Sequence, residues 1–192
     1  MTGRPATFEL EGIGTFTNDP SWWDTYYRGP DFPIEVLGQP VTFALGYGPI
    51  EGRAAELVIE AINNFRAAGS ELRDEVARYM VEYYQSVRNM FSEEECVDYD
   101  IPLDVSVENV WEHVSFRHPP TLEPSLDDRG GLHHADIAYI SFEGGCSWEI
   151  EHGMQLVFLH GQRVCKIGNY PGHPTNAATA ANPDLLDVVL RH

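Results

Sequence analysis

The densest group of side chains able to hold a metal ion or move a proton lies between His133 and His173. Its members are histidines, glutamates and a cysteine: His133, Glu143, Cys146, Glu149, Glu151, His152, His160 and His173. A transition metal needs three or four nitrogen, oxygen or sulfur ligands converging at about 2.0–2.3 Å. The spacing matches neither His-Glu-x-x-His nor a paired-cysteine motif. We therefore predict no metal and no cofactor.

A metal site remains as the alternative. It would use Glu151, His152 and His173, with Glu143 or Cys146 as a further ligand, in a metal-binding protein or metal-assisted hydrolase. Glu151 and His152 are adjacent, so on a regular strand their side chains would point to opposite faces. They can share an ion only if Gly153 ends a turn beneath them.

Nucleophilic catalysis has one candidate, Cys146, which follows two glycines and has His152 six residues later as a base. A reactive cysteine needs an electropositive site that lowers its thiol pKa. The surroundings of Cys146 are acidic, and no Gly-x-Ser-x-Gly elbow surrounds Ser141 or Ser147. We predict a buried structural cysteine and no catalytic residue, which favours a binding protein over an enzyme.

Charge is the most informative property of the composition. Twelve Lys and Arg residues against 30 Asp and Glu residues give a net charge of −18 among 192 residues. Such a field repels phosphate backbones and anionic lipid, which bind through basic side chains. Nucleic acid and membranes are therefore excluded as expected partners. A basic protein fits, because complementary charge speeds encounter; acidity that serves only solubility is the competing interpretation.

Two aromatic pairs, Trp22-Trp23 and Tyr26-Tyr27, stand in a segment that is rich in β-forming residues. Consecutive side chains on a strand face opposite sides, so one member of each pair needs a cover or a partner. Exposed tryptophan is typical of binding hot spots. The predicted binding residues are therefore aromatic, acidic and histidine side chains: Trp22, Trp23, Glu149, Glu151, His152 and His173.

The N-terminal stretch and the cysteines bear on location. The residues from Met1 to Glu11 contain no apolar core of a signal peptide. Cys96, Cys146 and Cys165 are odd in number and form no Cys-x-x-Cys pair, which favours free thiols in a reducing compartment. No stretch has the apolar length of a membrane span. We expect a cytoplasmic protein.

The elements that must position these residues follow from hydrophobic periodicity. The first third alternates apolar and polar residues between turns, which predicts an antiparallel meander with strands at 8–11, 22–28, 32–37 and 41–45. Helical spacing then runs over 54–65 and 72–90, and Gly69 separates the two helices. Residues 93–100 are predicted to be an acidic, solvated loop.

The remainder returns to strands. We predict a short helix at 106–114, a loop from 119 to 131, and strands at 137–142, 154–159 and 164–167, with His160-Gly161 forming a tight hairpin turn. A loop at 171–176 and a short helix at 184–190 complete the chain. The prediction is one domain, residues 1–192, of the α+β class: a mostly antiparallel sheet of N- and C-terminal strands packed against a central pair of helices.

The C-terminal third carries a motif. Trp148-x-x-Glu151-His152-Gly153 is followed by a hairpin and then by Gly168-x-Tyr170-x-Gly172-His173-x-Thr175-Asn176. In this motif the chain resembles a bacterial family of uncharacterised proteins, a domain of unknown function. The resemblance transfers no catalytic residue. Similar small acidic proteins are suspected to be immunity proteins, so the resemblance implies a domain that neutralises a basic bacterial toxin; the oligomeric state stays open.

Overall fold

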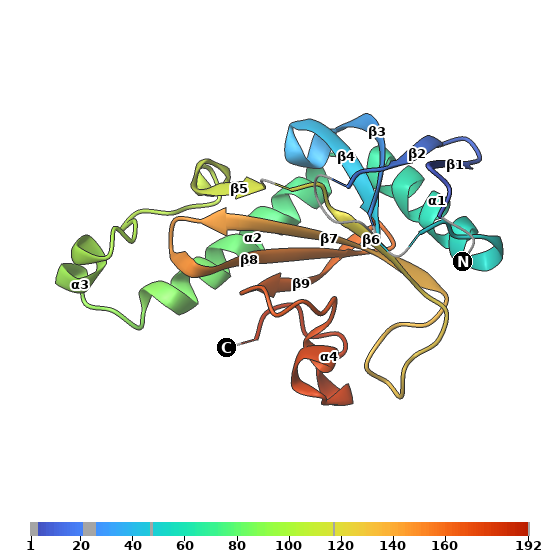
Figure 1. Ribbon diagram of the computed structural model, residues 1–192. Helices are drawn as coiled ribbons and strands as arrows, with labels where there is room; N and C mark the ends of the chain where they lie inside the picture. Colours follow the sequence, from blue (N-terminus) through green and yellow to red (C-terminus); the bar gives the residue numbers. More distant parts are fainter. Residues whose placement is uncertain (1–3, 21–25, 47, 117, 192) are drawn as a thin grey trace.

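A single mixed sheet forms the frame of the molecule in the computed structural model, which describes residues 4–20, 26–46, 48–116 and 118–191. Within these residues the sheet has nine strands, in the order β1-β2-β3-β4-β6-β7-β8-β9, with β5 beside β7 (Figure 1). The strands are β1 (Thr7–Leu10), β2 (Gly14–Asn18), β3 (Tyr27–Ile34), β4 (Gln39–Leu45), β5 (Val114–Phe116), β6 (Thr121–Ser125), β7 (Ile137–Cys146), β8 (Glu149–Leu159) and β9 (Arg163–Gly168). Only β4 and β6 pair in parallel among them. The α+β prediction, with strands from both ends of the chain, is confirmed.

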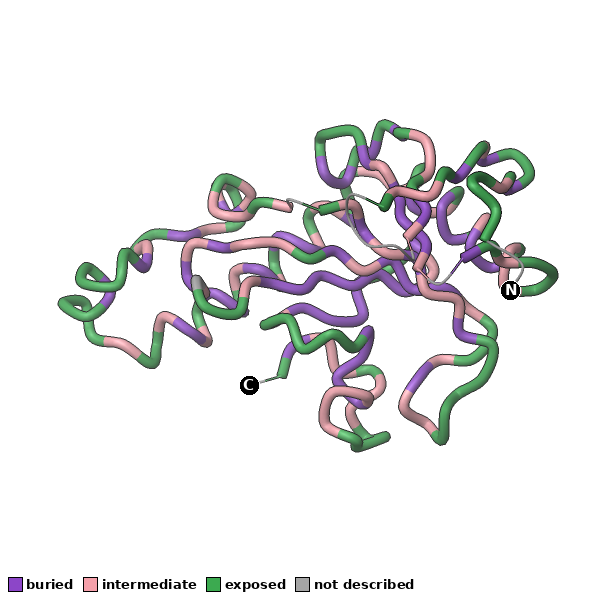
Figure 2. Tube along the Cα trace, viewed as in Figure 1, coloured by how far each residue is buried: buried purple, intermediate pink, exposed green. Residues whose placement is uncertain are grey.

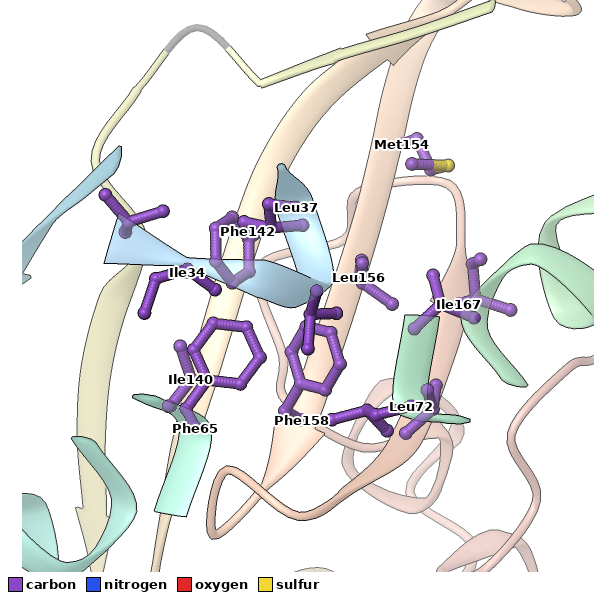
Figure 3. Packing of buried hydrophobic residues seen from close by; sticks show 14 of the residues in the cluster. Ile34, Leu37, Phe65, Leu72, Ile140, Phe142, Met154, Leu156, Phe158 and Ile167 are labelled. Carbon is purple, nitrogen blue, oxygen red and sulfur yellow. The ribbon is translucent and has the colours of Figure 1, made fainter. Parts of the chain in front are cut away.

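Two long helices, α1 (Gly52–Ala67) and α2 (Ser70–Arg88), cover one face of this sheet. The apolar stripe of α1 follows the helical period, so Leu57, Val58, Ala61, Ile62 and Phe65 are all buried. Figure 3 shows Phe65 meeting Phe142 and Phe158, with ring centroids 5.9 and 4.6 Å apart. The predicted central pair of helices therefore packs on the C-terminal strands.

The other face of the sheet carries a second, smaller apolar cluster. Along β7 and β8, Ile140 and Phe158 point into the main core, whereas Tyr139 and Val157 belong to the second cluster. This alternation follows from the two-residue period of a strand. The short helix α4 (Asn176–Ala180) and the 3-10 turn η3 (Pro183–Leu185) lie beside β9 (Figure 1). Buried residues run along the central strands of the sheet (Figure 2).

The expected acidic loop at 93–100 is wrong in its first part, because residues Glu93–Asp98 form helix α3. Ser92 and Glu95 make a capping box, in which each side chain bonds the other residue's backbone N–H. Cys96, a residue of this helix, is buried. The capping signal was present in the sequence, but the run of glutamates obscured it.

Two further elements differ from expectation. Residues 121–125, expected in a loop, form β6; Pro124 is tolerated there because β4 pairs only with Thr121 and Leu122, so no backbone N–H is needed further along. The expected helix at 184–190 is reduced to η3. Beyond it, Ile167 donates its N–H to Val189 and bridges Leu190 in parallel.

The segment expected to be a helix at 106–114 is also different. It contains only a 3-10 helix, η2 (Val110–His113), which runs directly into β5; another such helix, η1 (Glu35–Leu37), follows β3. The Asn109 side chain accepts from Ser106 N–H and donates to the Asp104 carbonyl, which replaces helical hydrogen bonds by local ones. In the described part of the chain, no helix combines the length and apolar character needed to cross a bilayer.

The predicted hairpin turn between β8 and β9 is confirmed. His160 and Gly161 both have positive φ, 51° and 71°, as a two-residue turn with right-handed strand twist requires. The turn lies against α1: a Cβ on Gly161 would stand 2.2 Å from the Ala61 carbonyl oxygen and 2.8 Å from the Phe65 nitrogen. Asn64 also donates to the His160 carbonyl at 3.0 Å. Glycine is therefore required by contact as well as by conformation.

Replacing Gly161 with alanine tests this packing. The strained φ and the collision with helix backbone should together cost about 2–4 kcal/mol of folding free energy, measured by urea denaturation. Gly12 is the matched control, because its φ is 73° and a Cβ there meets no atom within 4 Å. Gly12→Ala should cost only about 1 kcal/mol. Equal losses in the two variants would contradict the close approach.

Candidate functional site

Of the predicted site residues, the structure brings Glu149 and His152 together at the start of β8. Glu149 Oε1 lies 3.3 Å from both the backbone nitrogen and Nδ1 of His152. The strand is bulged there: Cys146 pairs with Glu149 while Gly144 pairs with Met154, and Gly153 has a φ of 67°. The bulge breaks the strand alternation and lets residues three apart meet. His152 is 61% exposed, so this pair contributes little stability.

The remaining predicted residues lie elsewhere. Glu151 is exposed beside the pair. His173 is exposed on the loop after β9, in the neighbourhood of Glu123 and His133. Burial raises the pKa of Glu123 and lowers the pKa of His133, since each charged form loses hydration. Trp22 and Trp23 lie outside the described residues.

The metal alternative therefore has no assembled donor set. Across the described ranges, no three His, Cys, Asp or Glu side chains are grouped so that they could hold a metal ion. Glu151, His152, His173, Glu143 and Cys146 all belong to those ranges. The Glu-His-Gly segment instead shapes the backbone, because a Cβ on Gly153 would stand 2.7 Å from the Gly144 carbonyl oxygen.

Cys146 lacks the environment of a nucleophile. It is buried, and burial raises the pKa of its thiol to about 12, with the Glu149 carboxylate acting in the same direction. The thiolate is the reactive species, so the thiol is inert at neutral pH. Cys165 is equally buried, and burial raises its pKa to about 12 as well. Cys96 and these two are free thiols.

An open groove of about 560 Å³ lies beside Cys146, between η2, β5 and the β7–β8 hairpin. Its lining contains three carboxylates, those of Glu112, Glu143 and Glu149, and the imidazoles of His113 and His118. No lysine or arginine is among the described residues that line it. Three carboxylates, with neither lysine nor arginine in the described part of the lining, favour a cationic group.

The sequence pattern missed half of this groove because its two sides are about thirty residues apart. They meet because β5 pairs with β7, where Val114 faces Cys146 and Phe116 faces Gly144. Gly144 permits that pairing: a Cβ there would stand 2.4 Å from the Ser115 carbonyl oxygen. The Gly144-Gly145 pair was the available signal for so close an approach of two strands.

The sequence pattern also missed Lys166. It is the only lysine of the chain and is 2% exposed on β9. Its Nζ donates to the His173 carbonyl at 2.6 Å and to Thr179 Oγ1 at 2.9 Å. Burial lowers the pKa of Lys166 to about 8. The lysine therefore fixes the His173 loop against α4. Its ammonium group loses hydration in this buried position.

This burial predicts a pH dependence of stability. Between pH 8 and pH 10.5 the unfolded chain keeps a proton on Lys166 that the folded chain has lost. The contribution of Lys166 to the free energy of unfolding should therefore rise with pH through that window, by an amount on the order of 1–3 kcal/mol. Urea denaturation at several pH values measures it as the difference between the wild type and Lys166→Met.

Thr179→Val serves as the control, because it removes the hydrogen bonds of Thr179 Oγ1 to Lys166 Nζ and to the Thr175 carbonyl and keeps the amine. It should lower stability and keep the wild-type pH dependence. A constant difference between the wild type and Lys166→Met from pH 7 to pH 10 would contradict the burial of a charged amine.

The buried thiols predict slow modification. At pH 8, a pKa of about 12 in place of the ordinary 9.0 leaves about a thousandfold less thiolate on Cys146. A thiol reagent should therefore react slowly with the native protein and fully with the denatured chain. Ser115→Cys adds a thiol at an exposed position on the groove and should react at once. Rapid, stoichiometric labelling of native Cys146 would restore it as a candidate nucleophile.

The comparisons with known proteins show a family of uncharacterised proteins, as expected at that coarse level. The chain matches a family described as a domain of unknown function (DUF6985) over residues 12–174. No curated protein and no solved structure matches the chain significantly. The match spans strands β2 to β9, both long helices and the acidic groove. The chain belongs to the DUF6985 family.

Proposed function

We propose that this domain acts by binding a basic protein and that it performs no catalysis. The observation that carries the proposal is the groove lined by Glu112, Glu143 and Glu149, with neither lysine nor arginine among its described lining residues. It belongs to a chain with a net charge of −18. Lysine or arginine side chains of the partner would enter this groove and pair with its carboxylates.

The chemistry of the groove favours cation recognition over reaction. Its thiol, Cys146, has a pKa raised to about 12 by burial and does not supply a nucleophile. Its imidazoles, His113 and His118, stand beside carboxylates and can donate or accept hydrogen bonds from a bound side chain. An anionic substrate would be repelled by the same carboxylates.

The finer form of the proposal is an immunity protein that neutralises a basic bacterial toxin. A basic toxin is attracted over distances of about a Debye length, which speeds its capture. Occlusion of a toxin requires only a surface of matching charge and shape. This form is supported by the acidity of the chain and by the carboxylates that line the groove.

Affinity chromatography with a salt gradient tests the proposal. The immobilised domain should retain basic proteins from a bacterial lysate at low ionic strength and release them as salt rises, since the contact is electrostatic. The groove variant Glu112→Gln/Glu143→Gln/Glu149→Gln should elute the same proteins at clearly lower salt.

A charge-matched control separates the groove from the net charge. The variant Glu11→Gln/Asp74→Asn/Glu82→Gln removes three exposed carboxylates elsewhere. It should shift elution less than the groove variant does. Equal shifts would contradict the groove as the binding site, and failure to retain any basic protein at low ionic strength would contradict the proposed function itself.

A further inference from the structure

A projecting segment, residues 89–113, connects α2 to β5 and includes α3; we call it the acidic arm. Figure 1 shows α3 at the end of the molecule remote from β1–β4. The arm ends at Glu112 and His113, which line the groove described above. The groove therefore lies at the base of the arm.

The arm is held in place by buried anchors. Four of its side chains reach into the main core: Cys96, Ile101, Val105 and Val110. Tyr84 of α2 donates its hydroxyl to the Pro102 carbonyl at 2.8 Å. The Ile101 N–H closes the end of α3 by donating to the Cys96 carbonyl at 2.8 Å. A surface fixed in this way loses little conformational entropy when a partner binds.

Between these anchors the arm turns large apolar side chains outward. Among the described residues, seven large hydrophobic side chains are exposed, and five of them belong to the arm. They are Met90, Val97, Tyr99, Leu103 and Val107, with exposed fractions from 39% to 69%. Figure 2 shows the arm as mostly exposed backbone with a few buried points. Five of the seven therefore lie within 18 consecutive residues, where they can offer apolar contact to a partner.

The charges of the arm all have one sign. It contains eight acidic residues and neither lysine nor arginine: Glu93, Glu94, Glu95, Asp98, Asp100, Asp104, Glu108 and Glu112. A second copy of this chain would bring the same charges face to face, so self-association through the arm is opposed by repulsion. A basic partner would be attracted to it.

We propose that the acidic arm docks a segment of a basic protein in which apolar side chains alternate with lysines or arginines. The apolar side chains would cover Val97, Tyr99 and Leu103, and the cationic side chains would pair with the surrounding carboxylates. This inference rests on the proposed function and adds to it the place of docking and the apolar character of the partner.

Synthetic peptides separate the two levels of the proposal. A lysine–leucine peptide offers both features, and a lysine–serine peptide of equal charge offers only the charge. The wild-type domain should bind the lysine–leucine peptide about tenfold more tightly, because buried apolar contact adds to the electrostatic attraction. Fluorescence anisotropy with labelled peptides measures both dissociation constants.

Two leucine variants locate the apolar contact. Leu103 and Leu126 are both exposed, at 51% and 59%, but only Leu103 belongs to the arm. Leu103→Ser, and more strongly Val97→Ser/Leu103→Ser, should weaken lysine–leucine binding several-fold and leave lysine–serine binding unchanged. Leu126→Ser should change neither. Circular dichroism melting curves verify that all variants fold.

The charge variants complete the design. Glu93→Gln/Glu94→Gln/Asp98→Asn leaves the capping residue Glu95 in place. This variant should bind both peptides more weakly, and its binding should depend less on salt concentration. The matched variant Glu11→Gln/Asp74→Asn/Glu82→Gln should have a smaller effect on both. Sedimentation equilibrium of the free domain should give a monomer.

The outcomes distinguish the two proposals. If both lysine peptides bind equally, or if Leu103→Ser and Leu126→Ser behave alike, the arm is not the docking surface, while binding of basic proteins stands. If neither lysine peptide binds at low ionic strength, both proposals fail. Self-association that Leu103→Ser abolishes would make a second copy the occupant and overturn the inference.

Discussion

The contact between α1 and the β7–β8–β9 strands is the constraint on which the rest of the fold depends. Phe65 packs against Phe142 and Phe158, and the tip of the β8–β9 hairpin touches the helix backbone at Gly161. This contact joins the N-terminal meander, which leads into α1, to the C-terminal strands. It also fixes the length and position of β7 and β8, whose far ends carry the bulge, the glutamates and the edge of the acidic groove.

The positions of the groove and of the acidic arm follow from this packing. The end of β7 that is remote from α1 accepts β5 because Gly144 has no side chain. The pairing of β5 brings η2 and its Glu112 to the groove, and the acidic arm is the chain that leads from α2 to this point. Buried anchors hold the arm, so its carboxylates and apolar side chains stay exposed. Eight of the acidic residues are therefore held at a defined position, on the anchored arm.

The sequence was informative wherever local pattern and tertiary contact agree. The stripe of α1, the strand β4 and the His160-Gly161 turn are all found as expected, because in each the local pattern favours the conformation that the tertiary contacts then use. It failed where distant contacts decide: residues 184–190 extend the sheet edge at Ile167, and Thr121–Ser125 forms a strand in spite of its proline.

The candidate site was predictable only in part for the same reason. Glu149 and His152 meet because a local bulge brings them together, but Glu112 reaches the groove only through a strand pairing about thirty residues away. Lys166 resembles a solvent-facing residue of an ordinary edge strand until α4 is seen to cover it. The spacing of residues in the sequence does not indicate which distant element will bury a side chain.

The most direct measurement of the central claim is a nuclear magnetic resonance titration of the labelled domain with a lysine–leucine peptide. The account predicts that backbone amide shifts concentrate in residues 90–113 and at the groove residues of the β7–β8 hairpin. Shifts distributed over α1 and the β1–β4 meander, or no shifts at low ionic strength, would contradict it.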